Sequence, residues 1–217
     1  MVFDKHRPKI EKFEERNGKF KGKKLLFEQL EQLRGGMKVQ DRVIQALEGV
    51  LKTVDAPAAI FDIDETLILN VEDDGYKVNR PVYDVVRFLQ KKNVPIFVVT
   101  ARRKSKASAA YAIDQLCTFY SGLSGLYMVN KEHDDDDSAS IFKFRSRRRV
   151  MHKGYTIVLN AGDNWSDLGL MTKYKHHAVH ETWKKDYPSR NHHYLLQMVE
   201  ETSRLSWKVP NKDYEVD

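Results

Sequence analysis

The sequence has little of what cross-linked, fibrous or membrane-spanning proteins are built from. Its 217 residues contain a single cysteine, Cys117, which excludes a disulfide-stabilised scaffold. Eleven glycines and six prolines, without a fixed period, exclude a fibrous repeat. No uncharged apolar run approaches the ~18–20 residues of a membrane span, and the first residues hold no apolar stretch of signal-peptide length. We therefore expect a protein of the reducing cytoplasm without a membrane partner.

The composition is that of a folded domain with a basic N-terminal segment. Hydrophobic residues make up 41% of the chain and charged residues 31%, which suits a buried core beneath a solvated surface. Residues 1–54 hold 13 Lys and Arg against 8 Asp and Glu, so they carry +5 of the net charge of +6. Such a segment can attract anions, including nucleic acid and phosphorylated substrates. A plain solvated surface has the same composition, so charge alone does not decide between the two.

We predict two parts along the chain. Residues 1–54 form a basic arm and helices that pack on the core, and residues 55–217 form the main domain. In the first part, residues 25–34 are expected to form a short helix that ends at a pair of glycines. The apolar residues within 39–54 fall on one helical face, which predicts an amphipathic helix.

Apolar runs and helical patterns alternate through the main domain. We predict buried strands over residues 58–63, 94–99, 126–129, 155–159 and 178–181, and helices over residues 81–89, 107–117, 138–153 and 192–207. This alternation predicts an α/β fold with a doubly wound parallel sheet and helices on both faces. The stretch from Asp64 to Thr100 leaves room for little or no cap domain. In such sheets, ligands bind at the carboxyl ends of the strands.

Acidic and hydroxyl side chains follow three of the predicted strands. Asp62 and Asp64 end the first strand, Thr100 ends the second, and Asp163 and Asp167 follow the fourth. Two carboxylates one residue apart repel each other unless a cation lies nearby, and Mg²⁺ prefers such hard oxygen ligands. A hydroxyl beside free backbone amides can hold a phosphoryl oxygen. Helix caps and acidic turns have similar local sequences, but two acidic strand ends at one sheet edge favour a metal site.

Three of these segments resemble motifs I, II and IV of the haloacid dehalogenase-like phosphohydrolases. They are residues 61–67 (FDIDETL), 98–102 (VVTAR) and 162–168 (GDNWSDL). The chain is most similar to the acid phosphatase subgroup that includes plant vegetative storage proteins and bacterial outer-membrane nucleotidases. The signature of that subgroup also has a lysine and an arginine, here Lys143 and Arg147, before a Gly-Tyr pair. Together the matches extend over roughly residues 56–182.

The resemblance implies a catalytic role for each matched residue. Asp62 would be the nucleophile that forms an aspartyl-phosphate. Asp64 would be the general acid that protonates the leaving oxygen and then the base that activates water. Thr100 and neighbouring amides, including that of Ala101, would bind the phosphoryl oxygens. Lys143 would neutralise charge on the nucleophile and bind the phosphate.

The resemblance also implies a Mg²⁺ cofactor. The metal would be held by the Asp62 carboxylate, the Asp64 backbone carbonyl and Asp163, with Asp167 near its waters. A site without a cap is open to large substrates. Further residues are then expected at its mouth, and these candidates are Tyr76, Asn79, Arg80, Arg102 and Arg147.

We therefore expect a Mg²⁺-dependent phosphomonoester hydrolase that acts on nucleotides or other small phosphate esters. One alternative is a phosphatase for nucleic-acid ends or phosphoproteins, which the basic residues 1–54 and the arginines near Lys143 favour. Another is a catalytically silent binding or storage protein of the same fold. The presence of Asp62, the expected nucleophile, argues against a catalytically silent protein. The sequence does not specify an oligomeric state.

Overall fold

The computed structural model describes residues 11–12, 23–24, 28–30, 36–71, 75–130, 139–168, 195–198 and 204–210. The strands are β1 (Glu11–Lys12), β2 (Lys23–Lys24), β3 (Glu28–Gln29), β4 (Pro57–Phe61), β5 (Ile68–Val71), β6 (Gly75–Val78), β7 (Ile96–Arg103), β8 (Gly125–Val129), β9 (Thr156–Gly162), β10 (Leu195–Met198) and β11 (Leu205–Lys208). The helices are α1 (Val39–Leu51), α2 (Arg80–Lys91), α3 (Lys106–Phe119), α5 (Ala139–His152) and the short 3₁₀ helix η4 (Trp165–Leu168).

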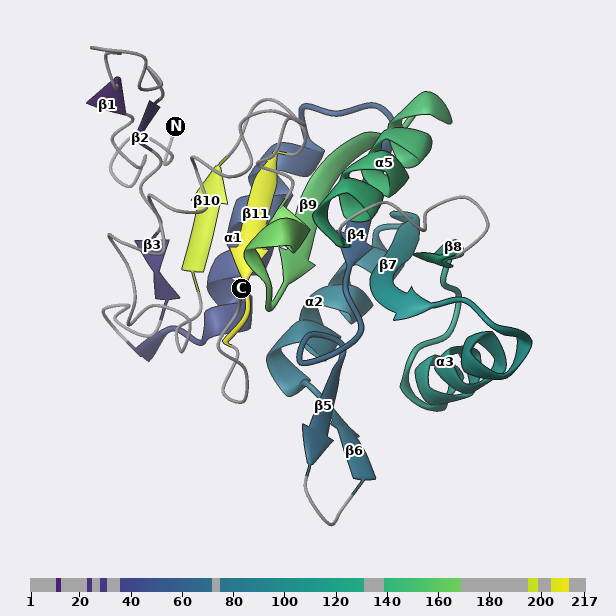
Figure 1. Ribbon diagram of the computed structural model, residues 1–217. Coiled ribbons are helices and arrows are strands. Elements are labelled where there is room, and N and C mark those ends of the chain that lie inside the picture. Colours follow the sequence, from purple (N-terminus) through teal and green to yellow (C-terminus); the bar gives the residue numbers. More distant parts are fainter. Residues whose placement is uncertain are drawn as a thin grey trace, which may run out of the picture.

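Seven strands form the central sheet, in the order β3-β10-β11-β9-β4-β7-β8. The five neighbouring strands from β11 to β8 are parallel. Strand β10 runs antiparallel to β11, and the edge strand β3 runs antiparallel to β10. After β4 the chain adds β7 and β8 on one side, then returns to place β9 on the other. The reversal beside β4 makes the sheet doubly wound, which confirms the predicted fold class (Figure 1).

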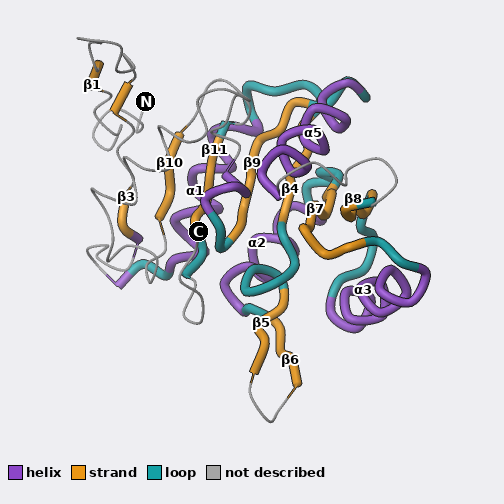
Figure 2. The backbone as a smooth tube through the Cα atoms, in the orientation of Figure 1, coloured by secondary structure: helices purple, strands orange, loops and turns teal. Residues whose placement is uncertain are grey.

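Two hydrophobic cores cover the two faces of the sheet. One core joins buried residues of α1, α2 and α3 to Phe61 and Val98 of the sheet. The other packs Phe142 and Val150 of α5 against Ile60. In Figure 2, α5 lies in front of the sheet and α1 behind it. This layering with helices on both faces agrees with the run of apolar residues in β4, since strands buried on both faces are nearly continuously apolar.

A short hairpin stands where a cap domain could have been inserted. Strands β5 and β6 pair antiparallel and project beyond the end of the sheet (Figure 1). The hairpin packs on α3 through an edge-on contact between Tyr76 and Phe119, whose ring centroids lie 6.2 Å apart. The Tyr120 hydroxyl also donates to the Leu67 carbonyl at 2.8 Å. These two contacts fix the connection to α2 against the core.

Two predicted helices were wrong. Within residues 25–34, Glu28 and Gln29 form a strand that pairs with β10. The predicted helix over 192–207 contains strands β10 and β11 instead. Strand β11 is buried at every position, so its sequence lacks the alternation of apolar and polar residues that distinguishes a strand from a buried helix. The strand predicted over 178–181 and most of the basic arm lie outside the described residues.

Helix α1 packs on the core, as predicted for the amphipathic helix within residues 39–54. Its buried residues Val43, Leu47 and Val50 join the same core as α2 and the sheet. Among the residues that the structure describes, no helix has the length and apolar character needed to cross a membrane.

We expect Leu47→Ala to lower the free energy of unfolding by about 2–5 kcal/mol, because it leaves a cavity at a fully buried position. Glu48→Ala, one residue on and exposed, is the control and should change stability by less than about 0.5 kcal/mol. Urea unfolding followed by circular dichroism measures both. Equal, small effects of the two changes would show that α1 does not contribute to the core.

Candidate active site

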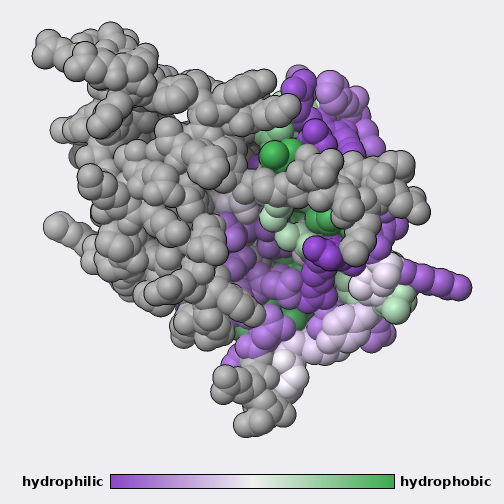
Figure 3. Space-filling view, in the orientation of Figure 1, coloured by the Kyte–Doolittle hydropathy of each residue, from purple (hydrophilic) through white to green (hydrophobic). Residues whose placement is uncertain are grey.

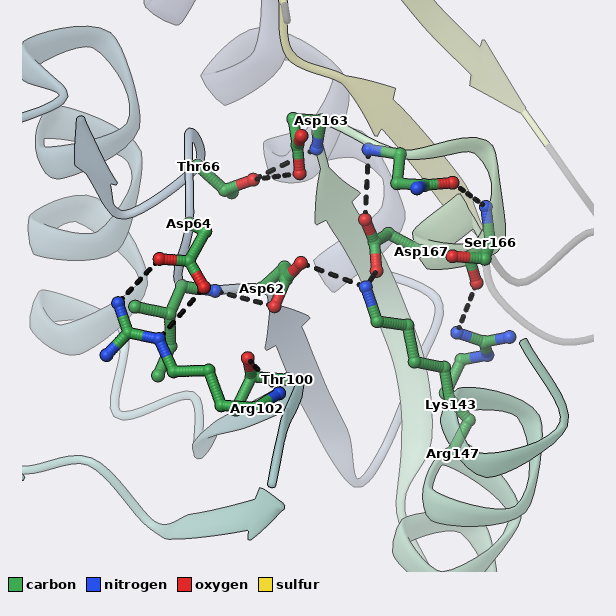
Figure 4. A network of polar contacts seen from close by, with 12 residues as sticks. Asp62, Asp64, Thr66, Thr100, Arg102, Lys143, Arg147, Asp163, Ser166 and Asp167 are labelled. Atoms are coloured by element: carbon green, nitrogen blue, oxygen red, sulfur yellow. Dashed lines mark hydrogen bonds and ion pairs between the residues drawn. The ribbon is translucent and has the colours of Figure 1, made fainter. Parts of the chain in front are cut away.

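Three carboxylates meet at the carboxyl ends of β4 and β9. One oxygen from each of Asp62, Asp163 and Asp167 lies within 4.8 Å of the others, and all three residues are buried. Strand pairing causes this, because β4 and β9 are neighbours and the Asp62 N–H donates to the Ala161 carbonyl at 3.0 Å. Helix η4 then returns Asp167 towards Asp163 (Figure 4). Three clustered oxygen donors are the type of group that binds a hard divalent cation.

Lys143 reaches this cluster from α5, which packs on one face of the sheet. Its ammonium lies 2.9 Å from Asp62 Oδ2 and 2.5 Å from Asp167 Oδ1. Asp62 Oδ1 accepts the Ile63 N–H at 2.8 Å, so both oxygens of Asp62 have a fixed partner. The lysine is itself buried, with 3% of its surface exposed. Strand, helix and 3₁₀ turn are thus joined by one buried cation.

The electrostatics of the cluster favour an added positive charge. Burial, together with Asp167 and Asp62, raises the pKa of Asp163 to about 8. Burial also raises the pKa of Asp62 to about 6, although Lys143 acts in the opposite direction. Burial disfavours the charged form of Lys143, but Asp167 and Asp62 outweigh it and raise its pKa above 10.5. Carboxylates that hold protons this strongly fit a site that a divalent cation completes.

Asp64 differs from the other acids because it faces the open side of the site. Its side chain is 38% exposed, against 7% for Asp62 and 4% for Asp167. Arg102 binds it with two nitrogens, Nε to Oδ2 at 2.9 Å and Nη2 to Oδ1 at 2.5 Å. Figure 4 shows this pair on the opposite side of Asp62 from Lys143. In Figure 3, hydrophilic residues gather on this face between the hairpin and α5.

The turn after β4 also holds the later acidic loop, a link that the sequence analysis missed. Thr66 Oγ1 accepts the Asp163 N–H at 2.9 Å and contacts Asp163 Oδ1 at 3.4 Å. Glu65 occupies the left-handed region, with φ of 51°, and its carboxylate accepts two hydrogen bonds from Asn70. Thr66 lies within the FDIDETL segment, which the sequence analysis identified. Its contact with Asp163 was missed because a hydroxyl that positions another residue has no characteristic spacing in a sequence.

The remaining candidates lie at different distances from the carboxylates. Thr100, predicted to end its strand, is buried within β7, which continues to Arg103. Its Oγ1 accepts the Arg102 N–H at 3.3 Å, and Ala101 beside it is exposed. Arg80 is exposed at the start of α2, with its guanidinium 6.0 Å from the centre of the Tyr83 ring. Tyr76 packs on α3, as described above. These positions bring Thr100 and Arg102 to the site but give Tyr76 and Arg80 no contact with its carboxylates.

Arg147 is buried rather than exposed at an entrance. Only 2% of its surface is accessible, and Nη1 donates to the Ser166 carbonyl at 3.0 Å. Burial lowers its pKa to about 10. Arg147 follows Lys143 by one helical turn, so the two buried cations lie on one face of α5. The arginine therefore supports η4, the turn that carries Asp167.

Lys208 is a second buried lysine near the carboxylates, and the sequence analysis did not identify it. It ends β11 beside Gly162, is 0% exposed, and donates to the Val209 carbonyl at 2.8 Å. Burial lowers its pKa to about 8, while Asp163 and Asp167 oppose this shift. The predicted helix over 192–207 ended one residue before it, so no sheet position was assigned to this lysine.

Fold and site together define a haloacid dehalogenase-like phosphatase. The chain belongs to the family described as HAD superfamily, subfamily IIIB (acid phosphatase), whose sequence model matches residues 72–216. The match includes Lys143 and Asp163 but begins after Asp62 and Asp64, which join the site because β4 lies between β7 and β9. No curated protein matches the chain. Members of this superfamily generally use a divalent metal, and the buried carboxylates fit one.

We expect the metal-free protein to lose stability as the pH rises from about 4 to about 8. In the folded chain Asp163 and Asp62 keep their protons up to about 8 and about 6, against 3.8 as the ordinary value. The folded state binds more protons in this window, so its free energy of unfolding falls with rising pH. A divalent ion should offset the loss, so added Mg²⁺ should raise the melting temperature more at pH 8 than at pH 5.

Thermal unfolding at both pH values, with and without Mg²⁺, measures this effect. The Asp163→Asn variant is the control, since it removes the group with the larger shift and should flatten the pH dependence. Equal Mg²⁺-induced shifts at pH 5 and pH 8 in the unmodified protein would contradict the interpretation.

We expect Gly162→Ala to weaken binding of a divalent cation, with Mg²⁺ as the probe, by about 10–100-fold, because a Cβ at this position would overlap Cβ and Cγ of Asp167. The control is Gly125→Ala on β8, where the added Cβ meets Phe97 at 3.0 Å, away from the carboxylates. It should lower stability without changing the metal affinity. Calorimetric titration with Mg²⁺ measures the affinity, and unchanged binding by Gly162→Ala would contradict the close packing of Asp167.

Proposed function

We propose that the protein is a Mg²⁺-dependent phosphomonoester hydrolase that forms an aspartyl-phosphate on Asp62. We further propose nucleotides or other small phosphate esters as its substrates. The observation that carries this proposal is the buried Asp62 carboxylate, held by Lys143 at 2.9 Å within a cluster of three acids. A nucleophile needs fixed orientation and nearby positive charge for the phosphoryl oxygens, and these contacts supply both.

The first step transfers the phosphoryl group to the protein. A carboxylate oxygen of Asp62 attacks phosphorus, and the bond from phosphorus to the leaving oxygen breaks. Asp64 donates a proton to that oxygen, so the product leaves as an alcohol. For this donation the ion pair with Arg102 must open. The phosphate of an incoming substrate offers the arginine an alternative anion, which supports opening when substrate binds.

The second step releases phosphate and restores Asp62. Asp64, now a carboxylate, takes a proton from a water molecule whose oxygen attacks phosphorus. The bond between phosphorus and the Asp62 oxygen breaks, and inorganic phosphate leaves. Asp64 is thus returned to its protonated form for the next cycle.

Fixed donors balance the charge that spreads over the phosphoryl oxygens. We assign Lys143, the Thr100 hydroxyl and the Ala101 amide to these oxygens. Mg²⁺ would be held by Asp62, Asp163 and the Asp64 carbonyl, with Asp167 near its waters, and would neutralise phosphoryl charge when bound.

A second candidate substrate class is favoured by the outer face of α5. Three of its arginines, Arg145, Arg148 and Arg149, are exposed, unlike the buried Lys143 and Arg147. Exposed arginines can bind phosphates of a larger partner. Phosphorylated nucleic-acid ends or phosphoproteins are therefore the alternative substrates, and the site chemistry would be unchanged.

We expect Asp62→Asn to reduce turnover of an aryl phosphate by three orders of magnitude or more, at about the scale seen for lost nucleophiles. Asp114→Asn, which makes the same change at an exposed position of α3, should retain full activity. Chelation of Mg²⁺ should abolish the activity of the unmodified protein, and added Mg²⁺ should restore it. A fully active, folded Asp62→Asn variant would overturn the mechanism.

The same assay, run with a substrate panel, separates the candidate functions. The panel contains nucleoside monophosphates, sugar phosphates, phosphopeptides and 3′-phosphorylated DNA. The highest kcat/KM identifies the substrate class. Absence of turnover with every ester in the presence of Mg²⁺ would instead favour a silent binding protein.

A further inference from the structure

The open side of the site contains two contacts, Arg102–Gln115 and Gln115–Tyr111, that the proposed phosphoryl chemistry does not use. Asp64 is the most exposed carboxylate of the group, as its 38% accessible side chain shows, and Arg102 lies next to it. In the proposed function, Asp64 protonates the leaving oxygen. Whatever surrounds Asp64 on its open side therefore faces the leaving group of the substrate.

Helix α3 supplies this surrounding surface through two residues one turn apart. Arg102 Nη1 donates to Gln115 Oε1 at 2.6 Å, and Gln115 Nε2 donates to the Tyr111 hydroxyl at 3.0 Å. The Arg102 guanidinium also lies 6.0 Å from the centre of the Tyr111 ring. A continuous chain of contacts thus leads from Asp64 through Arg102 and Gln115 to Tyr111.

The Tyr111 ring is both exposed and fixed in position. It is 55% accessible, whereas Gln115, which holds its hydroxyl, is only 1% accessible. An exposed aromatic side chain ordinarily keeps its rotamer freedom, and ordering it on binding reduces affinity. Here a buried amide orders the ring beforehand. A preordered ring beside a cation is suited to stack on a flat aromatic group, as proteins do with nucleobases.

The position of the ring limits which aromatic group it can reach. The Arg102 guanidinium lies between Asp64 and the Tyr111 ring. A ring bonded directly to the leaving oxygen, as in phenyl phosphate, would meet Arg102 first. A base carried on a sugar lies farther from the phosphate and can reach Tyr111.

We propose that Tyr111, oriented by Gln115 and flanked by Arg102, is the specificity-determining residue of a leaving-group subsite for the base of nucleoside monophosphates. The proposal rests on the proposed function, because the role of Asp64 identifies this side with the leaving group. Tyr111 touches the substrate base, and Gln115 is a positioning residue that acts through Tyr111 and Arg102.

The test compares kcat/KM for adenosine 5′-monophosphate, phenyl phosphate and glycerol 3-phosphate. Tyr111→Ala should lower kcat/KM for the nucleotide about fivefold or more, the lower end of what base stacking contributes, with an increase in KM. The kcat/KM of Tyr111→Ala for glycerol 3-phosphate should change less than twofold. Tyr111→Phe keeps the ring but loses the Gln115 bond, so it should lie between the unmodified protein and Tyr111→Ala.

Ile113→Ala is the matched control, because Ile113 is the other large exposed apolar residue of α3, with 51% accessibility. It should leave all three substrates unchanged. An equal loss by Tyr111→Ala on nucleotide and glycerol 3-phosphate would show a purely structural role and overturn the proposal. An unchanged kcat/KM of Tyr111→Ala for adenosine 5′-monophosphate would overturn it as well.

A binding measurement separates failure of the subsite from failure of the proposed function. If the unmodified protein hydrolyses none of the three esters, the proposed function fails. Calorimetric titration with adenosine 5′-monophosphate then decides the subsite. Binding that weakens about fivefold or more in Tyr111→Ala but not in Ile113→Ala supports it, and no binding, or equal binding by all three proteins, overturns it.

Discussion

Lys143 connects parts of the site that come from distant segments of the chain. Its ammonium meets Asp62 at the end of β4 and Asp167 in η4, so α5 is tied to both. All three groups are buried, and removing one partner of a buried ion pair costs about 3–5 kcal/mol because the other charge is left unpaired. The placement of α5 on the sheet therefore depends on this contact as well as on Phe142 and Val150, which anchor the same helix in the apolar core.

The sheet topology explains why the acids could be predicted to converge. Alternating strands and helices indicated a doubly wound sheet, and its reversal point lies where β4 and β9 are neighbours. Asp62 and Asp163 follow these two strands, so their meeting requires only that both strands be recognised. Each strand contains a short run of buried apolar residues, 58–61 in β4 and 157–159 in β9. The meeting of Asp62 and Asp163 can therefore be predicted without knowledge of side-chain geometry.

Other parts of the site depend on contacts that leave no periodic trace in a sequence. The basic run around Lys143 contains buried and exposed residues of the same charge, and Arg147 is distinguished from Arg148 only by the face of α5 on which it lies. Lys208 lies in β11, whose residues are buried on both faces and so gave no alternation to separate strand from helix. Thr66 acts on Asp163 from 97 positions away, across the junction of two strands.

The site has a closed side and an open side, which have different chemical tasks. In the proposed function, the buried carboxylates and Lys143 on the closed side face a phosphoryl group that is the same in every monoester. In the same proposal, Arg102 and α3 on the open side face the part of the substrate that varies. The carboxylates directly follow β4 and β9 or lie in η4, whereas Gln115 and Tyr111 lie in α3, so residues of α3 can change without moving the acids. Under the proposed function, preference for a leaving group can therefore evolve on α3 while the carboxylates and Lys143 stay in place, and the Asp64–Arg102 pair is where the two sides meet.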